Sequence, residues 1–177
     1  KLSWGNWIVC NAAGDWAFRA KSTEIQLPFD IKYPAAQTQT GWKGSGTADD
    51  PWLIETPADL LALSDSVNYV SGVQVSARCY KAFEGKYFKQ TKAINLSGIN
   101  FPPIGGFDEM YRFAGHYDGG NKIISNLYVN SGKAGDAALF GAVDTVASIK
   151  NVKMTNPKVI DEYMYAGTVA AYCQGTL

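Results

Sequence analysis

The chain has 177 residues, and 16 Lys and Arg residues balance 16 Asp and Glu residues, so that the formal net charge is zero. This balance, without a basic stripe, argues against nucleic acid as a partner. No apolar run reaches the roughly 18 residues that a membrane-spanning helix needs, so the sequence predicts no such segment.

Residues 1–40 are predicted to form a region of short β-strands. Apolar segments at Trp4–Cys10 and Trp16–Ala20 flank a turn, and apolar and polar residues alternate over Ile25–Tyr33. Pro28 lacks a backbone N–H, so the third segment is expected at the edge of a sheet. This region either packs against the side of the following fold or is the remnant of a preceding β-sandwich module.

A helix is predicted after a polar linker and a short strand at Pro51–Ile54. Thr56 is a good N-cap residue, Pro57 suits the first helical position, and Asp59 completes a capping box. The expected helix covers residues 56–68. Its apolar face carries Leu60, Leu63 and Val67. Such a helix covers backbone groups and apolar side chains that the first coil of a solenoid would expose, so we assign it the role of a cap.

A short pattern recurs three times between residues 113 and 175, after one strand pair expected within residues 85–96. Its glycines, Gly115, Gly141 and Gly167, are evenly spaced, since 141 − 115 equals 167 − 141. A second similarity relates the segment around Asn126 to the segment around Asn151, with a displacement (151 − 126) that is shorter by one. Apolar and polar residues alternate in each copy, which predicts strands, and a repeat of this length is typical of a solenoid.

We therefore expect residues 41–177 to form an all-β domain, a β-solenoid in which each copy is one coil. In the expected register the three glycines form one column at tight corners, and Asn126 stacks on Asn151. The chain begins at Lys1 without Met, and its last copy stops inside a coil. We expect a mature or excised piece, whose open last coil either continues in a longer protein or packs against another chain.

Several segments resemble, in order and spacing, the GLUG-type repeat domains of bacterial surface and secreted proteins. The resemblance covers about residues 41–175 and is carried by Gly46–Leu63, Gly85–Phe88, Ala93–Leu96, Pro103–Gly105, Phe113–Leu127 and Leu139–Gly141. Similar stretches precede the catalytic part of some immunoglobulin-A-cleaving metallopeptidases. The resemblance implies a right-handed parallel β-helix, an extracellular or cell-surface location, and adhesion or display. It transfers no catalytic residue, and we expect a host or matrix protein or a glycan as partner.

Two side chains of one predicted strand, His116 and Asp118, share a face and have the chemistry of an acid–base pair. The next copy holds Ala142 and Asp144 at these positions, so we interpret the pair as structural and keep both residues as candidate ligand contacts. Stacking of Asp118 toward Asp144 is the one arrangement that would supply the paired carboxylates of a glycoside hydrolase. We predict no catalytic residue, no metal site and no cofactor.

Trp42 and Trp52 are the other candidate ligand contacts, since their rings suit sugars, and packing is their alternative role. The acids at Asp49–Asp50 and Asp108–Glu109 lack the alternating spacing of a calcium loop, and we interpret them as solvated. The three cysteines have no metal-like spacing and allow at most one disulfide. We therefore favour buried free thiols at Cys10, Cys79 and Cys173.

Three functions stay open. The first is a non-enzymatic extracellular or cell-surface module for adhesion or display. The second is a carbohydrate-active β-helix enzyme, a polysaccharide lyase or hydrolase, and the third is a targeting domain of a larger secreted enzyme. The outward residues of the repeat, Ser125 with Lys150 and Tyr128 with Lys153, supply no carboxylate–basic constellation, which favours the first function.

Overall fold

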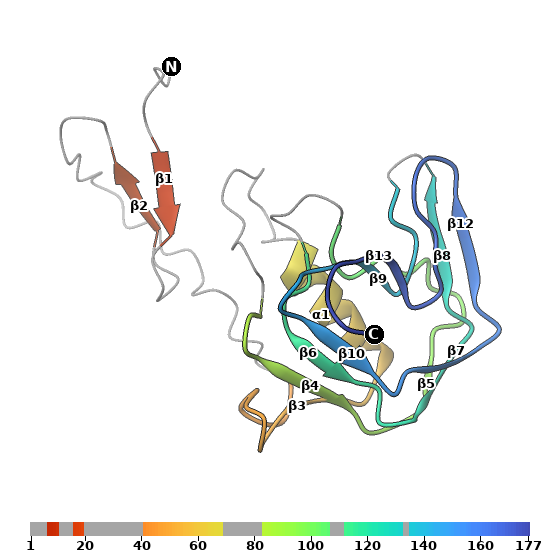
Figure 1. The fold of residues 1–177 in the computed structure, drawn as a ribbon. Coiled ribbons are helices and arrows are strands. Elements are labelled where there is room, and N and C mark those ends of the chain that lie inside the picture. The colour runs from red at the N-terminus through yellow and green to blue at the C-terminus, as the bar shows by residue number, and fades with distance from the viewer. Residues whose placement is uncertain (1–6, 11–15, 20–40, 69–82, 107–111, 133–134) are drawn as a thin grey trace.

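The computed structural model of the chain describes residues 7–10, 16–19, 41–68, 83–106, 112–132 and 135–177. Within these ranges the chain forms short β-strands and one α-helix (Figure 1), which agrees with the all-β class predicted from the sequence. In the N-terminal region, β1 (Trp7–Cys10) pairs antiparallel with β2 (Trp16–Arg19), which confirms the two strands predicted on either side of a turn. The predicted strand at Ile25–Tyr33 and the acids Asp108 and Glu109 lie outside the described residues.

Strand β3 (Trp52–Ile54) leads into helix α1 (Pro57–Asn68), whose start has the predicted capping box. The Oγ1 of Thr56 accepts the backbone N–H of Asp59 at 3.2 Å, and the Asp59 carboxylate accepts the backbone N–H of Thr56 at 2.8 Å. These two reciprocal bonds satisfy backbone donors that the first helical turn leaves without partners. Local residues therefore determine where the helix begins.

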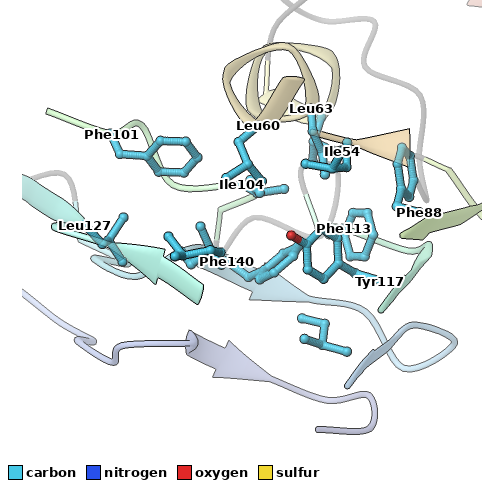
Figure 2. Packing of buried hydrophobic residues seen from close by; sticks show 14 of the residues in the cluster. Ile54, Leu60, Leu63, Phe88, Phe101, Ile104, Phe113, Tyr117, Leu127 and Phe140 are labelled. Atoms are coloured by element: carbon cyan, nitrogen blue, oxygen red, sulfur yellow. The ribbon is translucent and has the colours of Figure 1, made fainter. Parts of the chain in front are cut away.

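Helix α1 packs its buried side on the apolar interior of the fold. Leu60 and Leu63 lie in one buried cluster with Ile104 (Figure 2). The hydroxyl of Ser64 donates to the carbonyl of Pro102 at 2.8 Å, and the side-chain oxygen of Asn68 accepts the backbone N–H of Gly105 at 2.7 Å. The helix is thus fixed both by apolar contacts and by bonds to the backbone of a distant segment.

The remaining strands come from three successive passes of the chain. The first pass, residues 87–113, contains β4 (Tyr87–Gln90) and β5 (Ile94–Asn95). The second, residues 116–143, contains β6 (His116–Asp118), β7 (Ile123–Ser125), β8 (Tyr128–Gly132) and β9 (Phe140–Val143). The third, residues 148–173, contains β10 (Ser148–Lys150), β11 (Lys153–Thr155), β12 (Lys158–Asp161) and β13 (Ala170–Cys173).

Corresponding strands of successive passes pair in parallel and build four sheets. Their strand orders are β3-β4-β6-β10, β5-β7-β11, β8-β12 and β9-β13. Isolated parallel bridges extend the last two sheets to the first pass, where Asn100 pairs with Tyr128 and Ile104 with Phe140. Each pass therefore contributes one segment to every sheet, and the second pass has a neighbouring pass on both sides to complete its backbone hydrogen bonds.

The register between passes differs from the predicted one. Val129 lies opposite Val159 and Val143 lies opposite Cys173, so both pairs have the same offset (159 − 129 and 173 − 143). This offset is larger than the spacing of the repeated glycines (141 − 115), so the predicted stacking distance is wrong. The three glycines do not form a column, because Gly115 precedes β6, Gly141 lies within β9 and Gly167 precedes β13.

The glycines recur because the backbone approaches other segments closely at several different places. A Cβ at Gly141 would meet the carbonyl oxygen of Gly105, and a Cβ at Gly115 would lie 3.1 Å from the carbonyl oxygen of Lys86. The approach at Gly141 leaves no room for a side chain unless the backbone shifts, whereas at Gly115 a Cβ would make an unusually tight contact.

Asn126 and Asn151 also occupy different corners, so their predicted stacking is wrong. The side-chain amide of Asn126, after β7, donates to Asn95 at 3.0 Å, whereas that of Asn151, after β10, donates to Asp118 at 2.9 Å. Both backbones have a positive φ, 56° and 57°, which asparagine tolerates better than most residues. The similarity in sequence arises because successive corners need the same left-handed residue after a strand.

The first pass is longer than the second between two of its pairing points. Ile104 pairs with Phe140, and Phe113 pairs with Val143. The two pairing points are therefore nine positions apart in the first pass (113 − 104) and three apart in the second (143 − 140). Parallel pairing continues on both sides of this difference.

Candidate functional site

The outward side chains of β4, β6 and β10 form the surface that contains His116 and Asp118. Because the strands are in register, Tyr87, His116 and Ser148 form one column, and Lys89, Asp118 and Lys150 form a second. We call these six residues the outward face. Tyr117, between the two columns, is buried, whereas His116 and Asp118 are partly exposed. The two candidate residues therefore share the solvent side of the strand, as predicted.

The imidazole of His116 contacts the strands on both sides of β6. Its ring centroid lies 4.5 Å from that of Tyr87, with 31° between the ring planes. Its Nδ1 lies 2.9 Å from the hydroxyl oxygen of Ser148. These two contacts link β6 to β4 on one side and to β10 on the other.

The Asp118 carboxylate already has several partners. Its Oδ1 accepts the backbone N–H of Gly120 and the side-chain amide of Asn151, both at 2.9 Å, and its Oδ2 lies 3.7 Å from Nζ of Lys150. Partial burial raises the pKa of this carboxyl, but the hydrogen bonds from Asn151 and Gly120 and the charges of Lys150 and Lys89 outweigh burial and lower the pKa. A carboxylate held ionised in this way stabilises a corner and is a weak base.

The pairing of Asp118 with Asp144 that a glycoside hydrolase would need is wrong for this chain. Asp118 lies in β6, where its neighbours in register are Lys89 and Lys150. Asp144 follows β9, is buried, and accepts hydrogen bonds from the Thr145 hydroxyl at 3.0 Å and the Val146 backbone N–H at 3.2 Å. The two carboxylates belong to different sheets because paired strands are further apart in the chain than these two residues are.

Trp42 and Trp52 belong to a cluster of four aromatic rings. Their centroids are 5.6 Å apart, and Phe88 lies 5.2 Å from each of them, with Phe83 completing the group. Trp42 is 8% exposed and lies in the core. Trp52 is partly buried, and the ammonium group of Lys86 lies 5.8 Å from its ring. The structure thus places both tryptophans in packing contacts between the linker, β3 and β4.

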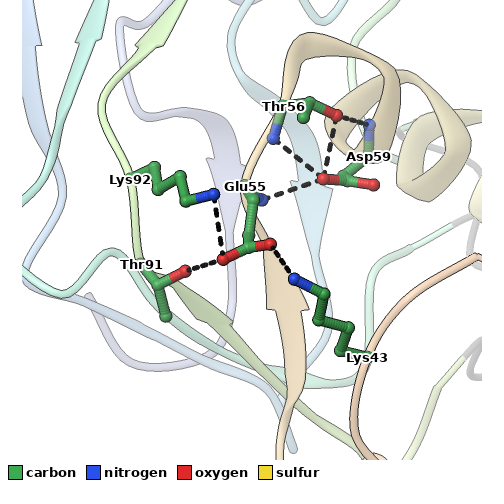
Figure 3. A network of polar contacts seen from close by, with 6 residues as sticks. All are labelled: Lys43, Glu55, Thr56, Asp59, Thr91 and Lys92. Carbon is green, nitrogen blue, oxygen red and sulfur yellow. Dashed lines mark hydrogen bonds and ion pairs between the residues drawn. The ribbon is translucent and has the colours of Figure 1, made fainter.

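A polar network that the sequence did not reveal surrounds Glu55, between β3 and α1 (Figure 3). Its carboxylate accepts hydrogen bonds from Nζ of Lys43 at 2.8 Å and from the hydroxyl of Thr91 at 3.2 Å. Nζ of Lys92 forms an ion pair with the same carboxylate at 3.5 Å. The hydrogen bond from Lys43 lowers the pKa of Glu55. Lys43 and Thr91 are 12 and 36 residues away in the chain, so no local pattern indicates them. The network joins the linker and the end of β4 to the start of the helix.

No group of three His, Cys, Asp or Glu side chains that would suit a metal ion occurs among the residues the structure describes. Asp49 and Asp50 are exposed. Cys173 is a partly buried free thiol, and the side chains of Cys10 and Cys79 lie outside the description. In the same described ranges, no helix has the length and apolar character that crossing a bilayer requires.

Two curated proteins are similar to the chain over about two thirds of its length. It is 32% identical over 118 residues to halomucin of Haloquadratum walsbyi, which covers 67% of this chain and 1% of halomucin. It is 29% identical over 125 residues to a Gly-rich membrane protein of Evansella cellulosilytica, which covers 67% of this chain and 12% of that protein. The chain thus spans a small part of the length of these relatives. No protein-family model and no solved structure matches the chain.

Proposed function

We propose that the four sheets are the walls of a right-handed parallel β-helix in which each pass is one coil. Three observations support this architecture: the strands of successive passes pair in parallel, the offset between the second and third passes is the same at three of the four walls (154 − 124, 159 − 129 and 173 − 143), and apolar side chains fill the interior. Parallel strands joined by a crossover are right-handed in about 98% of cases. The resemblance of residues 41–175 to GLUG-type repeat domains favours the same architecture.

On this scaffold the chain acts as a non-enzymatic module outside the cell or at its surface, with a role in adhesion or display. The names of the similar proteins, halomucin and a Gly-rich membrane protein, support a surface location. The contacts of His116 and Asp118 favour a structural role for these side chains over acid–base catalysis, because both bond to neighbouring strands or corners.

The outward face is the proposed binding surface, and an acidic glycan is the proposed ligand. The adjacent rings of Tyr87 and His116 offer apolar contact to a sugar, and Lys89 and Lys150 on either side of Asp118 offer charges to carboxylate or sulfate groups. The column arrangement repeats these groups at the spacing of neighbouring strands, about 4.8 Å. This juxtaposition of rings and ammonium groups carries the proposal.

A glycan array probed with the purified chain tests this function. We expect retention on acidic glycans that Tyr87→Ala and Lys150→Ala both weaken. Lys122→Ala, at an exposed corner outside the outward face, is the matched control and leaves retention unchanged. Release of shortened glycans would instead support the carbohydrate-active enzyme. Retention on a matrix protein alone, with no glycan bound, would contradict the proposed ligand.

A further inference from the structure

Interior side chains of β11, β12 and β13 in the third pass are less covered than the side chains in the same columns one pass earlier. Ile124, Val129 and Val143 of the second pass are 0%, 1% and 0% exposed. Their partners in register, Met154, Val159 and Cys173, are only partly buried. Each second-pass residue has a pass on both sides, so the difference indicates what a further pass would cover. We call β11, β12 and β13 the exit end.

The backbone of the exit end is open on the same side. Among the described strands, β11, β12 and β13 each pair with a single neighbour. The free N–H and C=O groups along such an edge are a template for another strand. Apolar surface and unpaired backbone therefore coincide at the exit end, which is the combination that strand addition uses.

Residues of the chain already occupy the first position of the next row. Thr176 pairs in parallel with Ser148, and its carbonyl accepts the backbone N–H of Ile149 at 2.9 Å. Ile149, which lies in the column of Tyr117, is 2% exposed. Ile149 is thus buried where Thr176 supplies the next paired segment, whereas Met154 and Val159, which have no such segment beside them among the described residues, are only partly buried.

We propose that the exit end is an interaction surface for one further pass of the same pattern, which enters at Thr176 and runs parallel to β11, β12 and β13. Its occupant is a segment of strand and corner as long as the offset between passes (159 − 129), with apolar side chains over Met154, Val159 and Cys173. A second copy of the chain fits less well, because Thr176 already bonds to the edge of β10. This inference rests on strand pairing and is independent of glycan binding.

A tandem chain tests the proposal, with a copy of residues 118–147 placed directly after Leu177. Each copied residue lies 60 positions after its original, twice the offset of 30 between Ile124 and Met154 (154 − 124). The copied Ile124, Val129 and Val143 then stand over Met154, Val159 and Cys173. Two quantities are measured: the urea midpoint, and the rate at which a maleimide labels Cys173 in a Cys10→Ser, Cys79→Ser background.

We expect the tandem chain to have a higher urea midpoint and to label at Cys173 at least about tenfold more slowly, because opening must now expose a covered column. The matched control carries the same copy with the copied Val129 and Val143 changed to Asp, and its Cys173 stays reactive. Equal labelling with and without the added pass, or equal protection by the Asp control, would overturn the proposal.

Two further measurements on the unextended chain keep the proposal testable if the tandem chain misfolds. Cys173 should label faster than a cysteine introduced by Val143→Cys, which lies in the same column one pass earlier. Sedimentation should give a monomer. A dimer whose Cys173 is labelled only after dilution would show that a second copy covers the exit end, against the proposal.

Discussion

The two ends of the stack of passes are finished in different ways. Before the first pass, α1 buries Leu60, Leu63 and Val67 to 4% exposure or less and bonds through Ser64 and Asn68 to the backbone of a distant segment. After the third pass, interior side chains stay partly exposed, and each strand of the exit end has one partner among the described strands. We call β3 and α1 the entry end.

The difference follows from how each finishing element satisfies its own backbone. A helix makes its hydrogen bonds internally, so it covers apolar side chains without offering a new edge. A strand bonded on one side repeats the same edge that it has just covered. At the entry end, α1 therefore adds no edge, and the outer side of β3 bonds to the linker, where the backbone N–H of Leu53 donates to the carbonyl of Lys43 at 2.8 Å. The exit end instead presents the same kind of strand edge that it covers on the second pass.

Removing a buried apolar side chain of α1 should have the largest effect on the free energy of unfolding. Leu63→Ala removes a side chain that is 0% exposed in the entry end, and we expect a loss of about 2–5 kcal/mol in the free energy of unfolding. Asp65→Ala, at an exposed position of the same helix, should change it by less than about 0.5 kcal/mol. Urea denaturation measures both. Equal effects would mean that α1 does not cover the interior.

A matched pair of valines compares the interior with the exit end directly. Val129 and Val159 occupy one column in successive passes. We expect Val129→Ala to cost about 2 kcal/mol, because two methyl groups and their packing are lost, and Val159→Ala to cost less than about 1 kcal/mol. Urea denaturation of both variants at several protein concentrations measures the two losses in the free energy of unfolding. Equal losses that depend on protein concentration would mean that another copy covers the exit end, against the prediction.

Low pH should lower the stability of the chain through Asp118 in the outward face, by less than the substitutions described above. Its pKa is lowered in the folded chain, so its contribution is complete above the ordinary Asp value of about 3.9 and is lost as the pH falls through the folded value. Asp118→Asn should therefore show a shallower loss of stability below about pH 4, by less than about 1 kcal/mol. Urea midpoints between pH 2 and pH 6, near these values, check this. An unchanged pH slope would contradict it.

Local chemistry explains which parts of the fold the sequence predicts. The capping box of Thr56 and Asp59 and the alternation around Tyr117 act within a few residues, so the helix and the strands are recognisable. Which strands pair depends on contacts between segments that are distant in the chain. Gly141 and Asn151 meet local backbone needs at different places, and their spacing from similar residues therefore suggests a repeat shorter than the offset between paired strands. The Glu55 network and the neighbours of Asp118 depend on the true register, so they follow from the structure alone.

The unequal lengths of chain between Ile104 and Phe113 and between Phe140 and Val143 have a consequence for variation among related chains. Since pairing occurs on both sides of a stretch of nine residues in one pass (113 − 104) and of three in the next (143 − 140), the scaffold accepts additional residues between these two pairing points without losing the pairing beyond them. Insertions, and any foreign peptide an engineer wishes to present, are best tolerated there. Divergence in length is expected to concentrate between such pairing points, while the paired strands themselves keep their register.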